Sequence, residues 1–159
     1  MKKFIASSII GLGLVSSAAA QDCIMVADLN VEFKNDSTIY MNNAERQEVV
    51  DFAKFLKQTG LYAVIEGHTS NTSSAPYNYQ LSQKRAVKVR AELIKLGVNS
   101  NQVRAMGFGE SSPLYNNTSD DGRQKNRRVI AEVFNSAADL NSYVTTEYKR
   151  VQKIKFDEQ

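Results

Sequence analysis

YAVIEGHTSNTSSAPYN, residues 62–78, runs directly into YQLSQKRAVKVRAELIKLG, residues 79–97. Apolar strand formers dominate residues 61–66, and after the polar loop the apolar spacing becomes helical. The sequence therefore predicts a strand over 61–66 that leads through a polar loop into a helix running from residue 78 or 82 to residue 96. Free backbone N–H groups, loop hydroxyls and the cation Arg85 meet near this helix start. Such a junction favours a pocket for a small anionic or zwitterionic group.

The rest of the chain supplies three more predicted strands and one more long helix. Polar and apolar residues alternate over residues 28–33, which places Leu29, Val31 and Phe33 on one face of a first strand. The further predicted elements are a helix over 43–59 capped by Asn42, a strand over 104–109, a brief helical turn over 122–126 and a strand over 128–134. This order, strand, helix, strand, helix, strand, strand, predicts an α/β fold of the α+β sandwich type, with helices on one face of a small mixed four-stranded sheet.

Residues 1–20 have the features of a secretory signal peptide. Lys2 and Lys3 precede an apolar run, and small residues at Ala18 and Ala20 form a cleavage site, so we expect cleavage after Ala20. The apolar run is shorter than the roughly 20 residues that a membrane span needs. No later stretch is apolar for long enough, so we expect no membrane span in the mature chain.

Removal of this leader brings the chain close to neutrality. The full sequence has 20 lysine and arginine residues and 17 acidic residues, so subtracting Lys2 and Lys3 leaves 18 against 17, a net charge of +1. A general attraction to nucleic acid then loses its main support, and we expect no nucleic-acid partner. Cys23 is the single cysteine, which excludes an intramolecular disulfide, and the residues before it do not match a lipoprotein cleavage box.

The sequence does not favour an enzyme. His68 is the only histidine, and no second histidine or nearby cysteine is present to complete a zinc site. No nucleophile and base, carboxylate pair or metal set can be assembled around it. We therefore expect no catalytic residues, no metal and no cofactor.

Residues 135–159 lie beyond the predicted core and fit a helical extension. Its apolar residues fall on one helical face, namely Leu140, Tyr143, Val144, Tyr148, Val151 and Ile154. Two interpretations are open. The extension folds back on its own domain, or it binds a protein partner in the cell envelope.

Residues 21–134 form the expected main domain, and within it the chain resembles the OmpA C-terminal-like peptidoglycan-binding domain, which also occurs in Pal lipoproteins and in the flagellar stator protein MotB. The resemblance rests on many short matches in the family's order and spacing. They are Gly67-His68-Thr69, Asn71-Thr72, Tyr77-Asn78, Leu81-Ser82, Arg85-Ala86, Val89, Leu93, Gly97-Val98, Gly107-Phe108-Gly109-Glu110, Pro113, Asn117, Gly122-Arg123 and Asn126-Arg127-Arg128-Val129.

This resemblance implies a periplasmic protein, associated with the cell wall or outer membrane, that binds the diaminopimelate residue of the peptidoglycan peptide stem without catalysis. A diaminopimelate end carries a carboxylate and an ammonium, so its recognition needs a guanidinium fork and hydrogen-bond acceptors. Carried over to this chain, the binding residues are Thr69, Ser70, Thr72, Asn78, Leu81, Arg85 and Arg127.

The chain departs from the family pattern at position 70. The family motif continues Gly-His-Thr with aspartate, whereas this chain has Ser70. A hydrogen bond to a charged group contributes about 1.5–3 kcal/mol against about 0.5–1.5 kcal/mol for a neutral one, so the change predicts a loss of roughly tenfold in affinity. Asp36 and Glu66 are both candidates to replace the missing carboxylate. The alternative function is an OmpA-like scaffold that no longer binds peptidoglycan and mediates protein contacts in the envelope.

Overall fold

A computed structural model describes residues 28–157, with side chains to residue 153. The expected signal peptide and Cys23 lie outside the described residues. The chain forms a four-stranded mixed sheet, which confirms the predicted α+β fold class, but its helices do not all lie on one face of the sheet as predicted, because the third and fourth helices, described below, lie on the other side from the second. The strands of the sheet, in the spatial order β1-β4-β2-β3, are β1 (Asn30–Glu32), β4 (Arg128–Phe134), β2 (Tyr62–His68) and β3 (Val103–Gly109). β4 pairs antiparallel with both β1 and β2, and only β2 and β3 run parallel.

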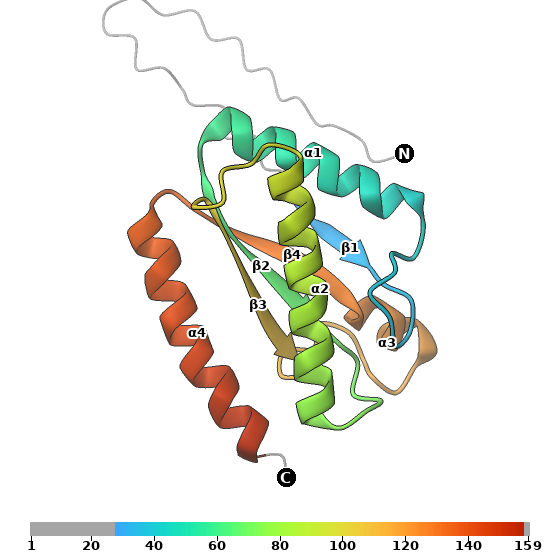
Figure 1. Ribbon diagram of the computed structural model, residues 1–159. Coiled ribbons are helices and arrows are strands. Elements are labelled where there is room, and N and C mark those ends of the chain that lie inside the picture. The colour runs from blue at the N-terminus through green and yellow to red at the C-terminus, as the bar shows by residue number, and fades with distance from the viewer. Residues whose placement is uncertain (1–27, 158–159) are drawn as a thin grey trace, which may run out of the picture.

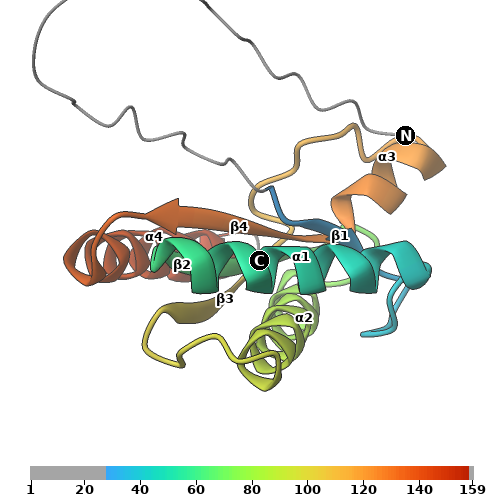
Figure 2. The same ribbon diagram turned by 90° about the horizontal axis from the view of Figure 1, so that it is seen from above.

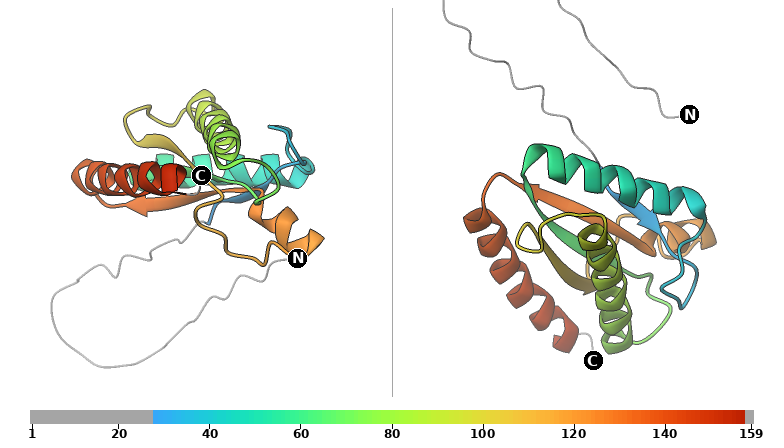
Figure 3. Two further views of the ribbon diagram at one scale, coloured as in Figure 1. Left: turned by 90° about the horizontal axis from the view of Figure 1, so that it is seen from below. Right: turned by 45° about the horizontal axis from the view of Figure 1, so that its top comes forward.

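The main core lies between the sheet and two long helices, α1 (Asn43–Thr59) and α2 (Ala75–Lys95). Leu29, Val31 and Phe33 are buried in it, as their alternation predicts. Asn42 caps α1, because its Oδ1 accepts a hydrogen bond of 2.8 Å from the Ala44 N–H. The parallel strands need a crossover connection, and α2 provides it. As Figures 2 and 3 show, the short helix α3 (Asp120–Asn126) lies on the other side of the sheet from α2.

The last helix, α4 (Ala137–Asp157), forms a second apolar cluster with the sheet. Val64 of β2 points away from the main core, because it alternates with buried residues of the main cluster on either side. It packs in the second cluster with Met106, Phe108, Leu140 and Val151. The C-terminal segment therefore folds back on its own domain, beside β3 (Figure 1), which is one of the two open interpretations. Tyr148 departs from the predicted apolar face, since it is 53% exposed.

Helix α2 begins earlier than the sequence pattern predicts. Its N-cap is Ser74, and Pro76 occupies the first turn, where proline is tolerated because the N–H it lacks has no intrahelical partner there. The apolar spacing becomes regular only later, which is why the pattern placed the start at residue 78 or 82. Asn78 is consequently a residue of the first helical turns.

Two glycines let α2 lie directly against the parallel strands. A Cβ atom at Gly67 would come within 2.0 Å of the Ser82 carbonyl oxygen, and one at Gly107 within 2.6 Å of the Gln83 nitrogen. The Ser82 hydroxyl also accepts a hydrogen bond of 2.9 Å from the Gly109 N–H. This close approach holds the part of α2 around Ser82 and Gln83 against the carboxyl ends of β2 and β3.

Candidate functional site

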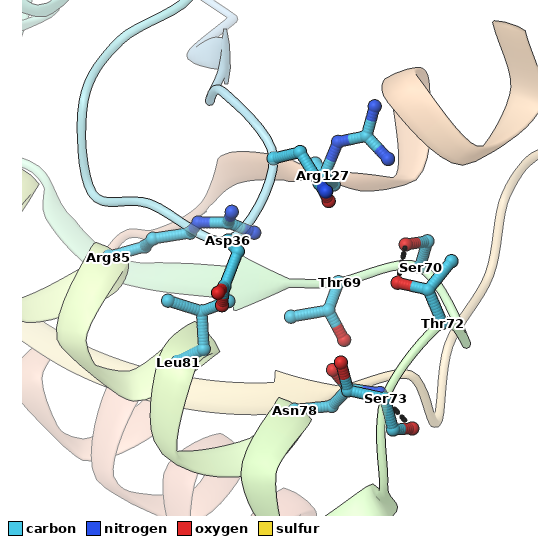
Figure 4. Close-up of a pocket in the computed structure, with 10 residues that line it drawn as sticks. Asp36, Thr69, Ser70, Thr72, Ser73, Asn78, Leu81, Arg85 and Arg127 are labelled. Atoms are coloured by element: carbon cyan, nitrogen blue, oxygen red, sulfur yellow. Dashed lines mark hydrogen bonds between the residues drawn. The ribbon is translucent and has the colours of Figure 1, made fainter. Parts of the chain in front are cut away.

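A pocket of about 210 Å³ lies where the loops after β1 and β2 meet the start of α2 (Figure 4). All seven residues that the sequence proposes as a binding site line it. Three further lining residues are Asn35, Asp36 and Ser73. Asn35 and Ser73 were not predicted, because nothing in the pattern of their polar loops distinguishes them from their neighbours. Asp36 was one of the two candidate acids, and the feature that indicated it was its position in the polar turn after the first strand.

Arg85 is fully buried in the wall of this pocket. Its Nε donates a hydrogen bond of 2.9 Å to the Ser37 carbonyl, its Nη1 one of 3.2 Å to the His68 carbonyl and its Nη2 one of 3.1 Å to the Lys34 carbonyl. The guanidinium also lies over the Phe33 ring, 5.2 Å from its centroid. Arg85 therefore joins the loop after β1 to the end of β2.

The Arg85 guanidinium retains hydrogen-bonding capacity and charge. A guanidinium has five N–H groups, and the three bonds above leave one on each terminal nitrogen. Among residues 28–153, no carboxylate lies within ion-pair distance of it. Burial lowers the pKa of Arg85 to about 10, with a further lowering from the charge of Arg127. The side chain is still a cation at neutral pH, and it has two N–H groups left that can donate to a ligand carboxylate.

Two threonines and a serine supply neutral oxygens. The Thr69 hydroxyl is buried and makes no hydrogen bond to the part of the chain that the structure describes. The Ser70 and Thr72 hydroxyls lie 3.2 Å apart and bond to each other. Ser70 is also buried. Position 70 therefore contributes a hydroxyl that already has a partner, and no charge.

Asn78 presents an amide oxygen. Its Nδ2 donates to the Ser73 carbonyl at 2.9 Å and to the Glu110 carboxylate. Because both partners are acceptors, the orientation of the amide is settled. The Asn78 oxygen therefore lies on the pocket side, facing the same space as the Thr69 hydroxyl in Figure 4.

Arg127 lies at the rim. Its Nε donates a hydrogen bond of 3.2 Å to Gln124 Oε1, and Nη2 contacts the same oxygen. In Figure 4 its guanidinium points away from Arg85 and from the centre of the pocket. Burial lowers the pKa of Arg127, and the nearby charge of Arg123 adds to this. Arg127 thus contributes positive electrostatic potential at the pocket entrance rather than a direct contact inside the pocket.

The two candidate acids lie in different places. Asp36 lines the pocket, and its Oδ1 accepts a hydrogen bond from the Tyr77 hydroxyl. Glu66 is buried away from the pocket, where its Oε1 accepts a bond of 2.6 Å from the Tyr143 hydroxyl of α4 and its Oε2 lies 3.6 Å from His68 Nε2. Only Asp36 is in position to replace a carboxylate missing at Ser70.

Within residues 28–157 the structure contains no group of three or more histidine, cysteine, aspartate or glutamate residues that could hold a metal ion. No described helix is both long enough and apolar enough to cross a membrane.

Comparison with known proteins agrees with this architecture. The profile of the OmpA family matches residues 33–127, more than half of the chain. The chain belongs to the OmpA family. Outer membrane porin F of Pseudomonas aeruginosa is 38% identical over 122 residues, which cover 72% of this chain and 34% of the porin. The chain therefore spans about a third of the length of that relative.

Solved structures of the OmpA family have the same fold. The peptidoglycan-associated lipoprotein of Burkholderia pseudomallei superposes with a TM-score of 0.63 at 28% identity, covering 66% of this chain and 89% of that one. The C-terminal domain of Helicobacter pylori MotB gives a TM-score of 0.61 at 26% identity, covering 80% and 96%. The predicted OmpA, Pal and MotB relationship is confirmed.

Proposed function

We propose that this chain is a non-catalytic protein of the cell envelope that binds peptidoglycan in the periplasm through the pocket around Arg85. The ligand group is the diaminopimelate residue of the peptide stem. The binding residues are those that the sequence proposes, Thr69, Ser70, Thr72, Asn78, Leu81, Arg85 and Arg127. Family membership supports the general function, since a solved OmpA-family relative is by name a peptidoglycan-associated lipoprotein.

One observation carries the proposal: Arg85 is a buried guanidinium in a pocket wall with no carboxylate partner among the described residues. A buried charge without an opposite charge is costly unless other groups compensate for its lost hydration. Three backbone carbonyls do so here. A ligand carboxylate loses contact with water when it reaches Arg85. Charge-assisted hydrogen bonds are stronger in such a buried site than at an exposed surface, so the contact favours binding.

A pull-down of the mature protein with isolated peptidoglycan sacculi tests this function. We expect retention of the wild-type chain and strong loss of retention for Arg85→Ala. Arg46→Ala is the matched control, because Arg46 is exposed on α1, outside the pocket. Circular dichroism and a thermal melt of each variant show whether it is folded. Absence of wild-type retention, or equal retention of a folded Arg85→Ala variant, would overturn the proposal.

The uncharged Ser70 supports a second candidate function, an OmpA-family scaffold that has lost peptidoglycan binding. In this scaffold, residues 135–159 would contact a protein partner in the envelope. Because α4 packs Leu140 and Val151 against the sheet, the partner would meet the opposite side of α4, which carries the exposed Tyr148. Co-purification with an envelope partner that depends on α4, without binding to sacculi, would favour the scaffold.

A further inference from the structure

Asp36 is the only acidic side chain among the ten residues that line the pocket. Its backbone φ is 47°, and it is the one non-glycine residue of the described chain in the left-handed region. Aspartate and asparagine adopt this conformation more readily than other residues with a side chain. The turn brings the carboxylate to the side of the pocket where Arg85 lies (Figure 4).

The Asp36 carboxylate is held in place without being neutralised. The Tyr77 hydroxyl donates to its Oδ1. No lysine or arginine of the described chain lies within ion-pair distance of Asp36. The pocket therefore presents a guanidinium and a carboxylate that are not in ion-pair contact, although the charge of Asp36 acts on Arg85 and partly opposes the lowering of its pKa. This arrangement is complementary to a ligand that carries both charges on neighbouring atoms.

Two neutral oxygens accompany the Asp36 carboxylate. The Thr69 hydroxyl is buried without a hydrogen-bond partner in the described chain, and the Asn78 amide oxygen is free to accept because its NH₂ group faces Ser73 and Glu110. An ammonium group has three N–H donors and needs acceptors. The pocket offers one charged acceptor and two neutral ones.

We propose that Asp36 binds the ammonium of the ligand and so supplies the charge that Ser70 lacks. Arg85 then binds the carboxylate attached to the same carbon, and the pair selects a free amino-acid end. This assignment rests on the proposed function and specifies which residue gives the site its preference for a zwitterion. Tyr77 is a positioning residue, because it acts through Asp36.

Calorimetric titration with two synthetic stem peptides tests the assignment. Both contain meso-diaminopimelate, and one has the side-chain amino group acetylated, which removes the ammonium. The key variant is Asp36→Asn, since asparagine keeps the shape and tolerates the left-handed backbone. Asp51→Asn is the matched control, because Asp51 is an exposed acid on α1 outside the pocket.

We expect the wild type and Asp51→Asn to bind the free peptide about tenfold or more tightly than the acetylated one. Asp36→Asn should weaken binding of the free peptide by about tenfold and leave the acetylated peptide nearly unchanged, so that the preference disappears. Adding Ser70→Asp to Asp36→Asn should restore part of the preference, because the charge returns to the same pocket.

The outcomes separate this assignment from the function on which it rests. If the wild type binds and Arg85→Ala does not, but Asp36→Asn keeps the wild-type preference or binds more tightly, the role of Asp36 is wrong and the function stands. If the wild type binds neither peptide nor sacculi, both proposals are wrong.

Discussion

The Arg85 guanidinium on α2 donates a hydrogen bond of 3.2 Å to the backbone carbonyl of His68, the last residue of β2. The same guanidinium bonds the carbonyls of Ser37 and Lys34 in the loop after β1. The cation that we assign to ligand binding is therefore also a connector between two loops of its pocket. Substitutions at this position should affect stability as well as binding.

Arg85→Lys should lower the free energy of unfolding by about 2–3 kcal/mol. A lysine ammonium has no planar fork, so at least one of the three carbonyls, which lie in buried or partly buried bonds, loses its donor. Urea denaturation followed by circular dichroism measures the change, and Arg46→Lys on the exposed face of α1 is the control. Equal stability of the two variants would contradict the connecting role.

Gly67→Ala should be much more destabilising than Gly60→Ala. At Gly67 the added Cβ meets the Ser82 backbone, which cannot move without shifting α2, so we expect a loss of about 3 kcal/mol or more. At Gly60 nothing lies within 4 Å of the added atom, and only the φ of 69° is unfavourable. We expect this to lower the free energy of unfolding by about 1–2 kcal/mol. Urea midpoints of the two variants test this order. A reversed order would show that α2 does not approach the strands so closely.

Tyr143→Phe should loosen the attachment of α4. The Tyr143 hydroxyl donates to the buried Glu66 carboxylate at 2.6 Å, and its removal leaves that carboxylate without the donor, at a cost of about 1–3 kcal/mol. Burial and the Glu66 carboxylate both raise the pKa of Tyr143, so the hydroxyl keeps its proton. Hydrogen exchange of α4 amides reports the effect. Tyr148→Phe is the control, since Tyr148 is exposed, and equal exchange in both variants would rule out this link.

Stability should fall as the pH drops below about 6.5, and His68 should be responsible. Burial lowers the pKa of His68 in the folded chain; Glu66 partly opposes this shift, and Arg128 adds to it. The unfolded chain then takes up a proton near its ordinary pKa of about 6.5, while the folded chain does not. The free energy of unfolding therefore decreases with falling pH, by at most about 1.4 kcal/mol per pH unit, until the pH reaches the lowered folded pKa.

Urea denaturation at pH 7.5, 6.5 and 5.5 measures this dependence above the range where most carboxylates titrate. Because His68 is the only histidine, His68→Gln should remove most of the decrease. A variant that keeps the full wild-type decrease would assign it to other groups.

The sequence predicted seven of the ten residues that line the pocket, both arginines among them, but not which acidic residue lies there. The spacing of Arg85 after the polar loop was sufficient to place it at the pocket, and the resemblance placed the other six residues there. The sequence could not decide whether Asp36 or Glu66 replaces the carboxylate that is missing at position 70. Glu66 lies in β2, three residues before the pocket residue Thr69, so it is close to the pocket along the chain. Its side chain nevertheless points to the face of the sheet that α4 covers, where it accepts a hydrogen bond from Tyr143.

The sequence also left undecided where α2 begins and what α4 packs against. Helical periodicity gave no signal through Ala75 and Pro76, because the first turn of α2 buries no apolar residue and its one buried residue is Asn78, which lines the pocket. The apolar face of residues 137–157 suited either a partner or the chain's own sheet. Its packing against Val64 and Phe108 depends on strands far away in the sequence.

Local patterns in the sequence by themselves determined the elements, the fold class and a cationic pocket at the end of the second strand, because alternation, helical periodicity and turn residues act over a few neighbouring positions. Only the tertiary structure decided that Asp36 faces the pocket and Glu66 does not, and that α4 covers its own sheet. These outcomes depend on strand pairing and on the face toward which each side chain points, which bring together residues tens of positions apart.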